Sequence, residues 1–423
     1  MVAPEISLKT RRIILSGYFF LTGICFSSWA SRIPDIKLHL GLSDGAFGGL
    51  LFFLPIGSFL GIPISGSLTA KYGSKKMVTI AAIIYPITLI SIGIAPTSTM
   101  LAICLFLFGM AGNLFNVSVN TQAANLSKLF EKSIVSAFHG FWSLAGLAGG
   151  LLGGFFVAQS ISPLQQFITV AIIGWVFLIF SNNYLLPGEK NSHPVSKMWN
   201  KPSPLILQFG LVAMSNMICE GMMFDWSGVY FQKVVKVSEE WRTTGYICFM
   251  ACMTTGRMFA DALINYWGAR KQLMLSGLVV TLGLIIAVSY PNMMVSSFGF
   301  MLVGFGVSSV IPTIYGTIGR NAAPGRASID LASVSSIGFF GFLIGPPIIG
   351  FLSQAIGLRW AFFSVGSFLV LSGLVLIVLP GPFTMPLVIA GLIVLAVEFA
   401  WAERLLAKAK VHAGKIVPKK YKK

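Results

Sequence analysis

Residues 61–76 join two long apolar runs and read Gly61-Ile62-Pro63-Ile64-Ser65-Gly66-Ser67-Leu68-Thr69-Ala70-Lys71-Tyr72-Gly73-Ser74-Lys75-Lys76. Each flanking run holds roughly twenty mostly apolar residues, which is long enough for a helix to cross a bilayer. The pattern returns 195 residues later and ends in Tyr266-Trp267-Gly268-Ala269-Arg270-Lys271. A basic, glycine-containing turn that recurs between apolar runs predicts a helical membrane protein built from two similar halves.

The composition agrees, because 55% of the residues are hydrophobic and only 10% are charged. A soluble domain carries about 25% charged residues. The net charge of +17 falls mostly in loops and the C-terminal tail, so it indicates topology and not nucleic-acid binding. The sequence contains no phosphate-cradling G-x-x-x-x-G-K-[ST] motif, which argues against an ATP-driven pump, and we expect neither an enzyme nor a cofactor.

The apolar runs predict twelve transmembrane helices, at 13–33, 46–70, 76–95, 98–124, 134–157, 163–186, 204–231, 243–266, 271–290, 293–319, 327–354 and 358–379. Alternate loops differ in basic residues: the loops on the N-terminal side carry 15 Lys or Arg, and those on the other side carry six. The positive-inside rule therefore places the N-terminus and the long central loop in the cytoplasm.

More residues repeat between the halves: Gly149 and Gly154 match Gly345 and Gly350 at a spacing of 196, and Trp29 matches Trp226 at 197. We expect four segments: a six-helix bundle over 1–186, a cytoplasmic linker over 187–203, a second six-helix bundle over 204–379, and an extra helix with a basic tail over 380–423. Transporters built from such repeats bind substrate between the bundles, near the middle of the membrane.

The turn at Gly66 to Lys76 resembles the loop motif G-x-L-x-D-R-x-G-R-K of the major facilitator superfamily, although Ala70 and, in the second half, Asn265 stand where the motif has an acid. Other stretches are similar to the bacterial inner-membrane YbjJ family, a fucose permease-like branch of that superfamily: Ser28-Trp29-Ala30-Ser31-Arg32-Ile33-Pro34, His139-Gly140-Phe141-Trp142-Ser143-Leu144, Glu220-Gly221-Met222-Met223-Phe224-Asp225-Trp226, Gly256-Arg257 and Gly345-Pro346-Pro347. The resemblance implies a major facilitator fold and a transport role, and it does not identify the substrate.

The last part of the chain is similar to small PGPGW membrane proteins, because Pro380-Gly381-Pro382 precedes a further apolar run; Phe383 departs from their pattern. This similarity implies a C-terminal hairpin helix, added by a natural or an engineered fusion. A thirteenth span would carry eight basic residues of the tail to the outer side, against the positive-inside rule. We therefore expect a re-entrant or interfacial helix here.

Ionisable residues inside a membrane span are costly and need a partner or a function. Glu220 lies past the middle of its predicted helix, shares a face with Asn216, and precedes Gly221, where a helix can break. It is either a carboxylate that binds a proton or a polar substrate group, or the partner of a buried cation such as Arg32; the two interpretations have equal weight. Arg32 and Asp225 either pair across the bundles as an outer gate or are each solvated.

Three amides, Asn113, Asn116 and Asn120, share a face of the fourth predicted helix, and Tyr315 lies on the equivalent tenth. They are either substrate contacts for a polar uncharged solute or hydrogen bonds between helices. Trp29, Trp142 and Trp226 either stack on a ligand or lie at the bilayer boundary.

His139 is either a proton relay or a structural residue. Arg257 and Asp261 are expected to pair with each other, or with Asp330, and to serve structure or gating. Cys248 and Cys252 are expected to be packing residues and not metal ligands.

Together these features predict a secondary active transporter, a monomer in the bacterial inner membrane. It would move a small polar solute, sugar-like or similar, by proton-coupled alternating access. Two alternatives remain open: an exporter of amphipathic compounds, and a non-transporting sensor that keeps the facilitator shell.

Overall fold

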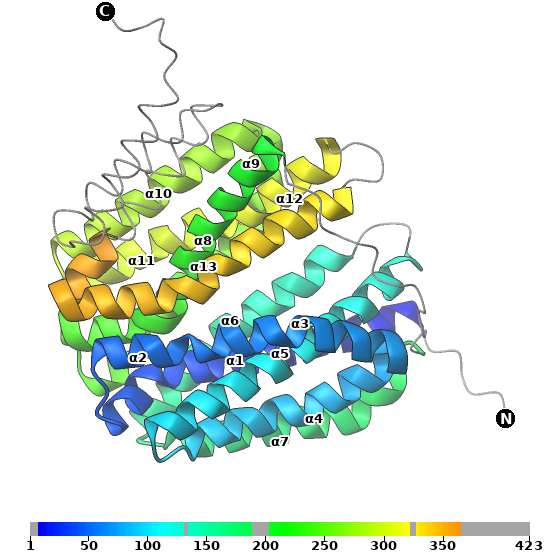
Figure 1. Ribbon diagram of the computed structural model, residues 1–423, viewed down its shortest axis with the longest axis horizontal. Coiled ribbons are helices and arrows are strands. Elements are labelled where there is room, and N and C mark those ends of the chain that lie inside the picture. The colour runs from blue at the N-terminus through cyan, green and yellow to red at the C-terminus, as the bar shows by residue number, and fades with distance from the viewer. Residues whose placement is uncertain (1–6, 131–133, 188–202, 322–326, 365–423) are drawn as a thin grey trace, which may run out of the picture.

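The computed structural model describes residues 7–130, 134–187, 203–321 and 327–364, and they are helical throughout apart from short turns. The first group of helices is α1 Leu8–His39, α2 Asp44–Leu51, α3 Phe53–Tyr72, α4 Ser74–Gly93, α5 Ser98–Ser127, α6 Val135–Ala158, α7 Pro163–Ser181 and the short 3-10 helix η1 Asn182–Tyr184. The second group is α8 Pro204–Tyr230, η2 Phe231–Val235, η3 Glu239–Trp241, α9 Thr244–Trp267, α10 Ala269–Ser289, α11 Met293–Ser308, α12 Val310–Asn321 and α13 Ala327–Ile356. Figure 1 shows the two groups side by side.

The repeated glycines of the basic turns end and begin helices as their positions suggest. Gly73 separates α3 from α4 with φ 86°, and Gly268 separates α9 from α10 with φ 75°. A side chain is strained at such angles, whereas glycine adopts them freely. The turn therefore recurs because both equivalent positions have a backbone angle that glycine adopts without strain.

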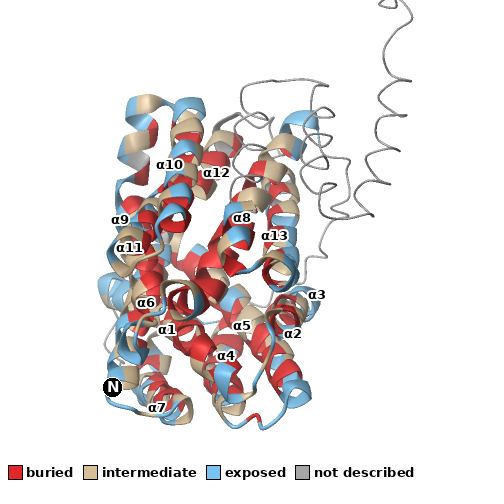
Figure 2. Ribbon diagram, turned by 90° about the vertical axis from the view of Figure 1, so that its left-hand side faces the viewer, coloured by how far each residue is buried: buried red, intermediate tan, exposed pale blue. Residues whose placement is uncertain are grey.

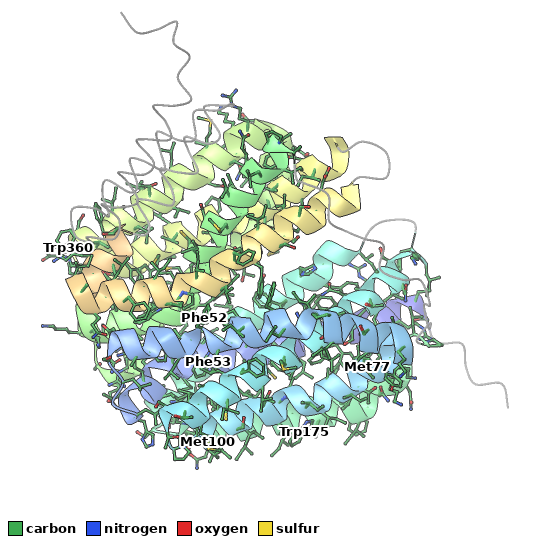
Figure 3. All side chains as sticks on the ribbon, viewed as in Figure 1. Phe52, Phe53, Met77, Met100, Trp175 and Trp360 are labelled. Carbon is green, nitrogen blue, oxygen red and sulfur yellow. The ribbon has the colours of Figure 1, made fainter. Side chains whose placement is uncertain are left out.

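Two predicted helices are each divided into two, and a proline lies four residues after the point where the first part of each ends. The helix predicted at 46–70 is α2 followed by α3, and the helix predicted at 293–319 is α11 followed by α12. Pro55 has no N–H to donate to Leu51, the last residue of α2, and Pro312 has none to donate to Ser308, the last residue of α11. Figure 3 labels Phe52 at the first break.

Helix packing repeats between the groups. In the first, α1 packs on α6, α3 on α5, and α4 on α5; in the second, α8 packs on α13, α9 on α11, and α10 on α11. The groups meet where α2 packs on α13, α6 on α9, and α1 on α8. Figure 2 shows buried residues gathered on the faces that helices turn toward one another, with exposed residues on the perimeter. In a membrane span such a perimeter faces lipid.

Among the described residues, ten helices or helix pairs are long and apolar enough to cross a membrane. The helix α9, which contains Arg257 and Asp261, is not one of these ten. Residues 358–364 begin the last predicted helix, and the rest of it lies outside the described residues together with the C-terminal hairpin. The count of twelve and the hairpin therefore remain predictions.

Candidate functional site

Glu220 lies on α8 and is buried, with 4% of its surface exposed. As the shared helix face predicts, Asn216 donates from Nδ2 to Oε1 of Glu220 over 2.7 Å. The other carboxylate oxygen, Oε2, lies 3.6 Å from Nη2 of Arg257 on α9. A buried carboxylate is costly unless it has such partners, so Glu220 and Arg257 form one unit.

Arg257 also reaches the other group of helices. Its Nη1 donates to Oγ of Ser143 on α6 over 2.7 Å, and Thr254 one turn earlier donates to the Ser143 carbonyl over 3.1 Å. The ion pair of the second half is thus hydrogen-bonded to the first half. The ion pair that the structure shows joins Arg257 to Glu220. The side chain of Asp261 lies outside the described residues, so the expected pairing of Arg257 with Asp261 or Asp330 stays a prediction.

Arg32 is not the cation beside Glu220, and it does not pair with Asp225. It is buried and satisfied within its own half: Nε donates to Oε1 of Gln166 over 2.6 Å, Nη2 to the carbonyl of Ile161 over 2.7 Å, and Nη1 pairs with Asp35 at 2.7 Å. The sequence missed these partners because Gln166 on α7 and Ile161 in the turn before α7 lie far along the chain. Within the described residues, Asp225 makes no hydrogen bond or ion pair.

Phe224 is buried and lies on α8 one turn beyond Glu220. Its ring contacts Phe26 of α1 and Trp142 of α6 across the two groups, with ring centroids 5.5 and 6.5 Å apart. Within the second half it stacks on Phe342 of α13, 6.2 Å away, and meets Tyr246 and Phe249 of α9. These aromatic residues pack around Phe224, which lies between Glu220 and the C-terminal end of α8.

Two carboxylates of the first half bind cations of the second at that end. Asp35 pairs with Arg242 at 3.3 Å, and Asp44 pairs with Lys233 at 2.6 Å. Asp44 also pairs with Lys37 of its own half at 2.8 Å and accepts from Oγ of Ser353 on α13 over 2.6 Å. We call Asp35, Asp44, Lys233, Arg242 and Ser353 the carboxylate latch, and the end of the molecule that contains it the latch end.

The predicted outer gate of Arg32 and Asp225 is therefore wrong, because Arg32 pairs with Asp35. Sequence reasoning missed the carboxylate latch, of which only Lys233 and Arg242 entered the prediction, as loop charges. The signal available in the sequence was the close spacing of Asp35, Lys37 and Asp44, which places both signs of charge on one short connection.

The three tryptophans differ in their surroundings. Trp29 and Trp226 are fully buried, and within the described residues neither indole N–H has a hydrogen-bond partner, so neither ring lies on the protein surface. Trp226 packs edge-on against Phe47 of α2 at 5.5 Å. Trp142 is partly buried and contacts Phe26 and Phe224, which places it beside the Glu220 region.

The asparagines of α5 do not join the Glu220 cluster through any hydrogen bond between described residues. Asn120 donates to Oδ1 of Asn116 over 2.6 Å, Asn116 is exposed, and the buried Oδ1 of Asn113 has no partner. Tyr315 is hydrogen-bonded to Ser335 at 2.6 Å. His139 is exposed, and its ring meets Phe19 edge-on at 5.5 Å.

The fold and the buried charge pair at the meeting of two similar helix groups define a membrane transport protein. The model of the major facilitator superfamily matches residues 14–329 and 245–390. The chain belongs to the major facilitator superfamily and is a multi-pass membrane transporter.

Relatives are similar to the chain in sequence, and solved structures are similar to it in fold. An uncharacterised transporter of this type from Yersinia pestis is 32% identical over 81% of this chain and 89% of its own length. The multidrug resistance protein 3 of Bacillus subtilis is 24% identical over 78% of this chain and 65% of its own length. The crystal structures of the nucleoside transporter NupG and of a D-xylose-proton symporter superpose with TM-scores of 0.71 and 0.69, at 12% and 13% identity. They cover 87% of this chain each, and 98% and 97% of their own chains, and they show the fold.

Proposed function

We propose that the protein is a secondary active transporter that moves a small polar solute across the bacterial inner membrane by proton-coupled alternating access. The observation that carries the proposal is the buried Glu220–Arg257 pair, which is also hydrogen-bonded across the two halves through Ser143. A buried ionisable group in a membrane span marks a substrate or proton site unless it is purely structural. Here Arg257, the partner of Glu220, also contacts the first half through Ser143.

The proton step follows from the charges. With Glu220 ionised, the carboxylate attracts the guanidinium of Arg257 and accepts from Asn216. Protonation removes the attraction and leaves Arg257 free to change partners. Because Arg257 also donates to Ser143, the proton on Glu220 alters a contact between the halves and so biases their relative position.

We place the N-terminus in the cytoplasm, which makes the latch end the outer surface and the described conformation closed on that side. We also propose that the chain forms two bundles, 1–186 and 204–379, joined by a cytoplasmic linker at 187–203, with a separate C-terminal element at 380–423. We further propose that the chain has twelve membrane spans and that it resembles the YbjJ family. The excess of basic residues on the N-terminal side supports this orientation.

A polar uncharged substrate is supported by the amides near the centre of α5, Asn113 and Asn116, of which Asn113 has an unpaired buried oxygen. The likeness in fold to transporters of nucleosides and of D-xylose fits a solute of this kind. The alternative is efflux of amphipathic compounds. It is supported by the aromatic residues around Phe224 and by the name of the Bacillus subtilis relative.

The test is uptake of radiolabelled D-xylose and uridine into proteoliposomes under an imposed proton gradient. The variant is Glu220→Gln, which retains the shape of the side chain but cannot ionise. We expect it to lose uphill accumulation while solute exchange without a gradient continues. The matched control is Glu240→Gln, because Glu240 is an exposed carboxylate that bonds only to Ser238 among the described residues.

Uphill, gradient-dependent accumulation by Glu220→Gln at the wild-type level would refute coupling through this residue. Ethidium export by the wild-type protein, with no uptake of either polar probe, would favour the efflux alternative.

A further inference from the structure

A cavity lies at the perimeter of the first half, at the end opposite the latch end. It has a volume of about 450 Å³ and is lined by Tyr72, Lys75, Lys76, Thr79, Ile80 and Asn182. These residues come from the end of α3, the start of α4 and the start of η1, which directly follows α7. The cavity is therefore formed by the basic turn at Gly73 together with a helix that lies on the outer side of the first group (Figure 1).

The cavity is cationic, and no acidic residue is among the described residues that line it. The ammonium groups of Lys71 and Lys76 lie 5.2 and 5.3 Å from the centroid of the same Tyr72 ring, so both positive charges lie beside this wall of the cavity. Within the described residues, Lys71, Lys75 and Lys76 take part in no ion pair. Ala70 stands where the resembling loop motif has an acid.

The polar groups beside the lysines also suit an anion. Thr79 donates to Oδ1 of Asn182 over 2.7 Å, which leaves the amide NH₂ of Asn182 as a donor at the cavity wall. Lysine ammonium and amide N–H groups are donors that phosphate oxygens accept from readily. An anionic phosphate between the lysines would also relieve their mutual repulsion.

An apolar strip continues from the cavity toward the centre of the spans. On α4, Ile80 of the cavity is followed along the same face by Ile83 and Ile87, which are 42% and 48% exposed. On the neighbouring α7, Ile179 and Phe180 are 72% and 75% exposed. Trp175 of α7, labelled in Figure 3, bridges the two helices by donating to the Ile83 carbonyl over 3.3 Å.

A ligand that fits both parts has a phosphate at one end and long apolar chains at the other. The cavity lies at the ends of the candidate spans Asp44–Tyr72 and Ser74–Gly93, which is the depth of lipid headgroups. We propose that this cavity is a binding site for the phosphate of an anionic phospholipid, with the acyl chains along the strip of α4 and α7. Basic pockets of this kind at the membrane surface bind anionic headgroups.

The test measures lipid binding to purified, delipidated protein by native mass spectrometry. The probes are phosphatidylglycerol, phosphatidylcholine with the same chains, and glycerol 3-phosphate as a phosphate without chains. We expect phosphatidylglycerol to bind more tightly than phosphatidylcholine, and glycerol 3-phosphate to bind weakly. The double variant Lys75→Gln/Lys76→Gln should weaken phosphatidylglycerol binding by about thirtyfold, at about 1 kcal/mol for each lysine removed.

The equivalent turn of the second half provides the matched control. Arg270→Gln/Lys271→Gln removes the same charge from exposed positions 195 residues further on and should leave phosphatidylglycerol binding unchanged. Lys75→Arg/Lys76→Arg should retain binding, which separates loss of charge from loss of fold.

Equal weakening by the two charge-removing variants would show a general surface effect and overturn the proposal. Equal binding of phosphatidylcholine would do so too, as would glycerol 3-phosphate binding as tightly as phosphatidylglycerol, which would identify a soluble phosphate compound as the ligand.

Discussion

Asp44→Asn should open the latch end of the molecule. The carboxylate of Asp44 is bound by Lys37 of its own half and by Lys233 and Ser353 of the other half. Only contacts that differ between two conformations change their balance. The Lys37 pair lies within one half and persists in both conformations, so the contacts to Lys233 and Ser353 set the size of the effect.

The magnitude follows from exposure and charge. The Lys233 side chain is 44% exposed, so its pair with Asp44 contributes about 0.5–1 kcal/mol after solvent screening. In Asp44→Asn the hydroxyl of Ser353 donates to a neutral amide oxygen instead of a carboxylate, which weakens this hydrogen bond by about 1 kcal/mol. The closed conformation should therefore lose about 1.5–2 kcal/mol relative to the open one, a shift of roughly ten- to thirtyfold in their ratio.

The assay is hydrogen–deuterium exchange of the protein in lipid nanodiscs, followed over α2 and the last turns of α13. In Asp44→Asn we expect exchange to become about tenfold faster in these segments and to stay unchanged in α4 and α7. Glu240→Gln, which removes an exposed carboxylate outside the latch, is the control. Unchanged exchange at the latch end would refute the reasoning, and a uniform rise in all helices would show general destabilisation instead.

Three other changes test the centre of the molecule and the closure of the latch end. Arg257→Gln leaves Glu220 buried without its cation and should lower the free energy of unfolding by about 2–3 kcal/mol, measured by thermal unfolding; the cost is less than for a fully buried pair because Arg257 is 23% exposed. The double variant Glu220→Gln/Arg257→Gln should recover most of this loss, and no recovery would contradict the pairing. Phe224→Ala removes a buried ring and should cost about 3–5 kcal/mol by the same measurement, whereas a cost under about 1 kcal/mol would mean that the aromatic contacts are loose. Gly48→Leu should keep the latch end open, because a Cβ at Gly48 would lie 2.7 Å from the Cα of Gly350 on α13; exchange at wild-type rates there would contradict this.

Local features of the structure could be predicted from the sequence. The turns at Gly73 and Gly268 depend on one backbone angle and on the ends of apolar runs. The bond from Asn216 to Glu220 depends on helical spacing alone. The two helix breaks were harder to predict: Pro55 and Pro312 each remove a hydrogen-bond donor there, yet Pro63 and Pro86 lie inside continuous helices.

Partners across the fold could not be predicted in the same way. Glu220 pairs with Arg257 and not with Arg32 because α8 and α9 are neighbours at that depth, which helical periodicity does not determine. Arg32 is satisfied by Gln166 on α7, 134 residues away, and the latch joins Asp44 to Lys233 across the two halves. Such contacts depend on how helices cross. From the sequence alone, several charged residues in loops or spans were equally good candidates for each partner.

The halves share their turns and packing but not their central chemistry. At the spacing of 197 that relates Trp29 to Trp226, the position equivalent to Glu220 is Gly23, where a Cβ would lie 2.6 Å from the Trp142 carbonyl of α6. The first half therefore uses this position for close packing of α1 on α6, and the second uses it for a charge. Under the proposed function, a proton or substrate that acts on Glu220 would act on one half only, and Arg257 would transmit the change to α6 through Ser143. Such a one-sided site can bias two otherwise similar bundles toward one relative position, because the contact that it alters lies between them.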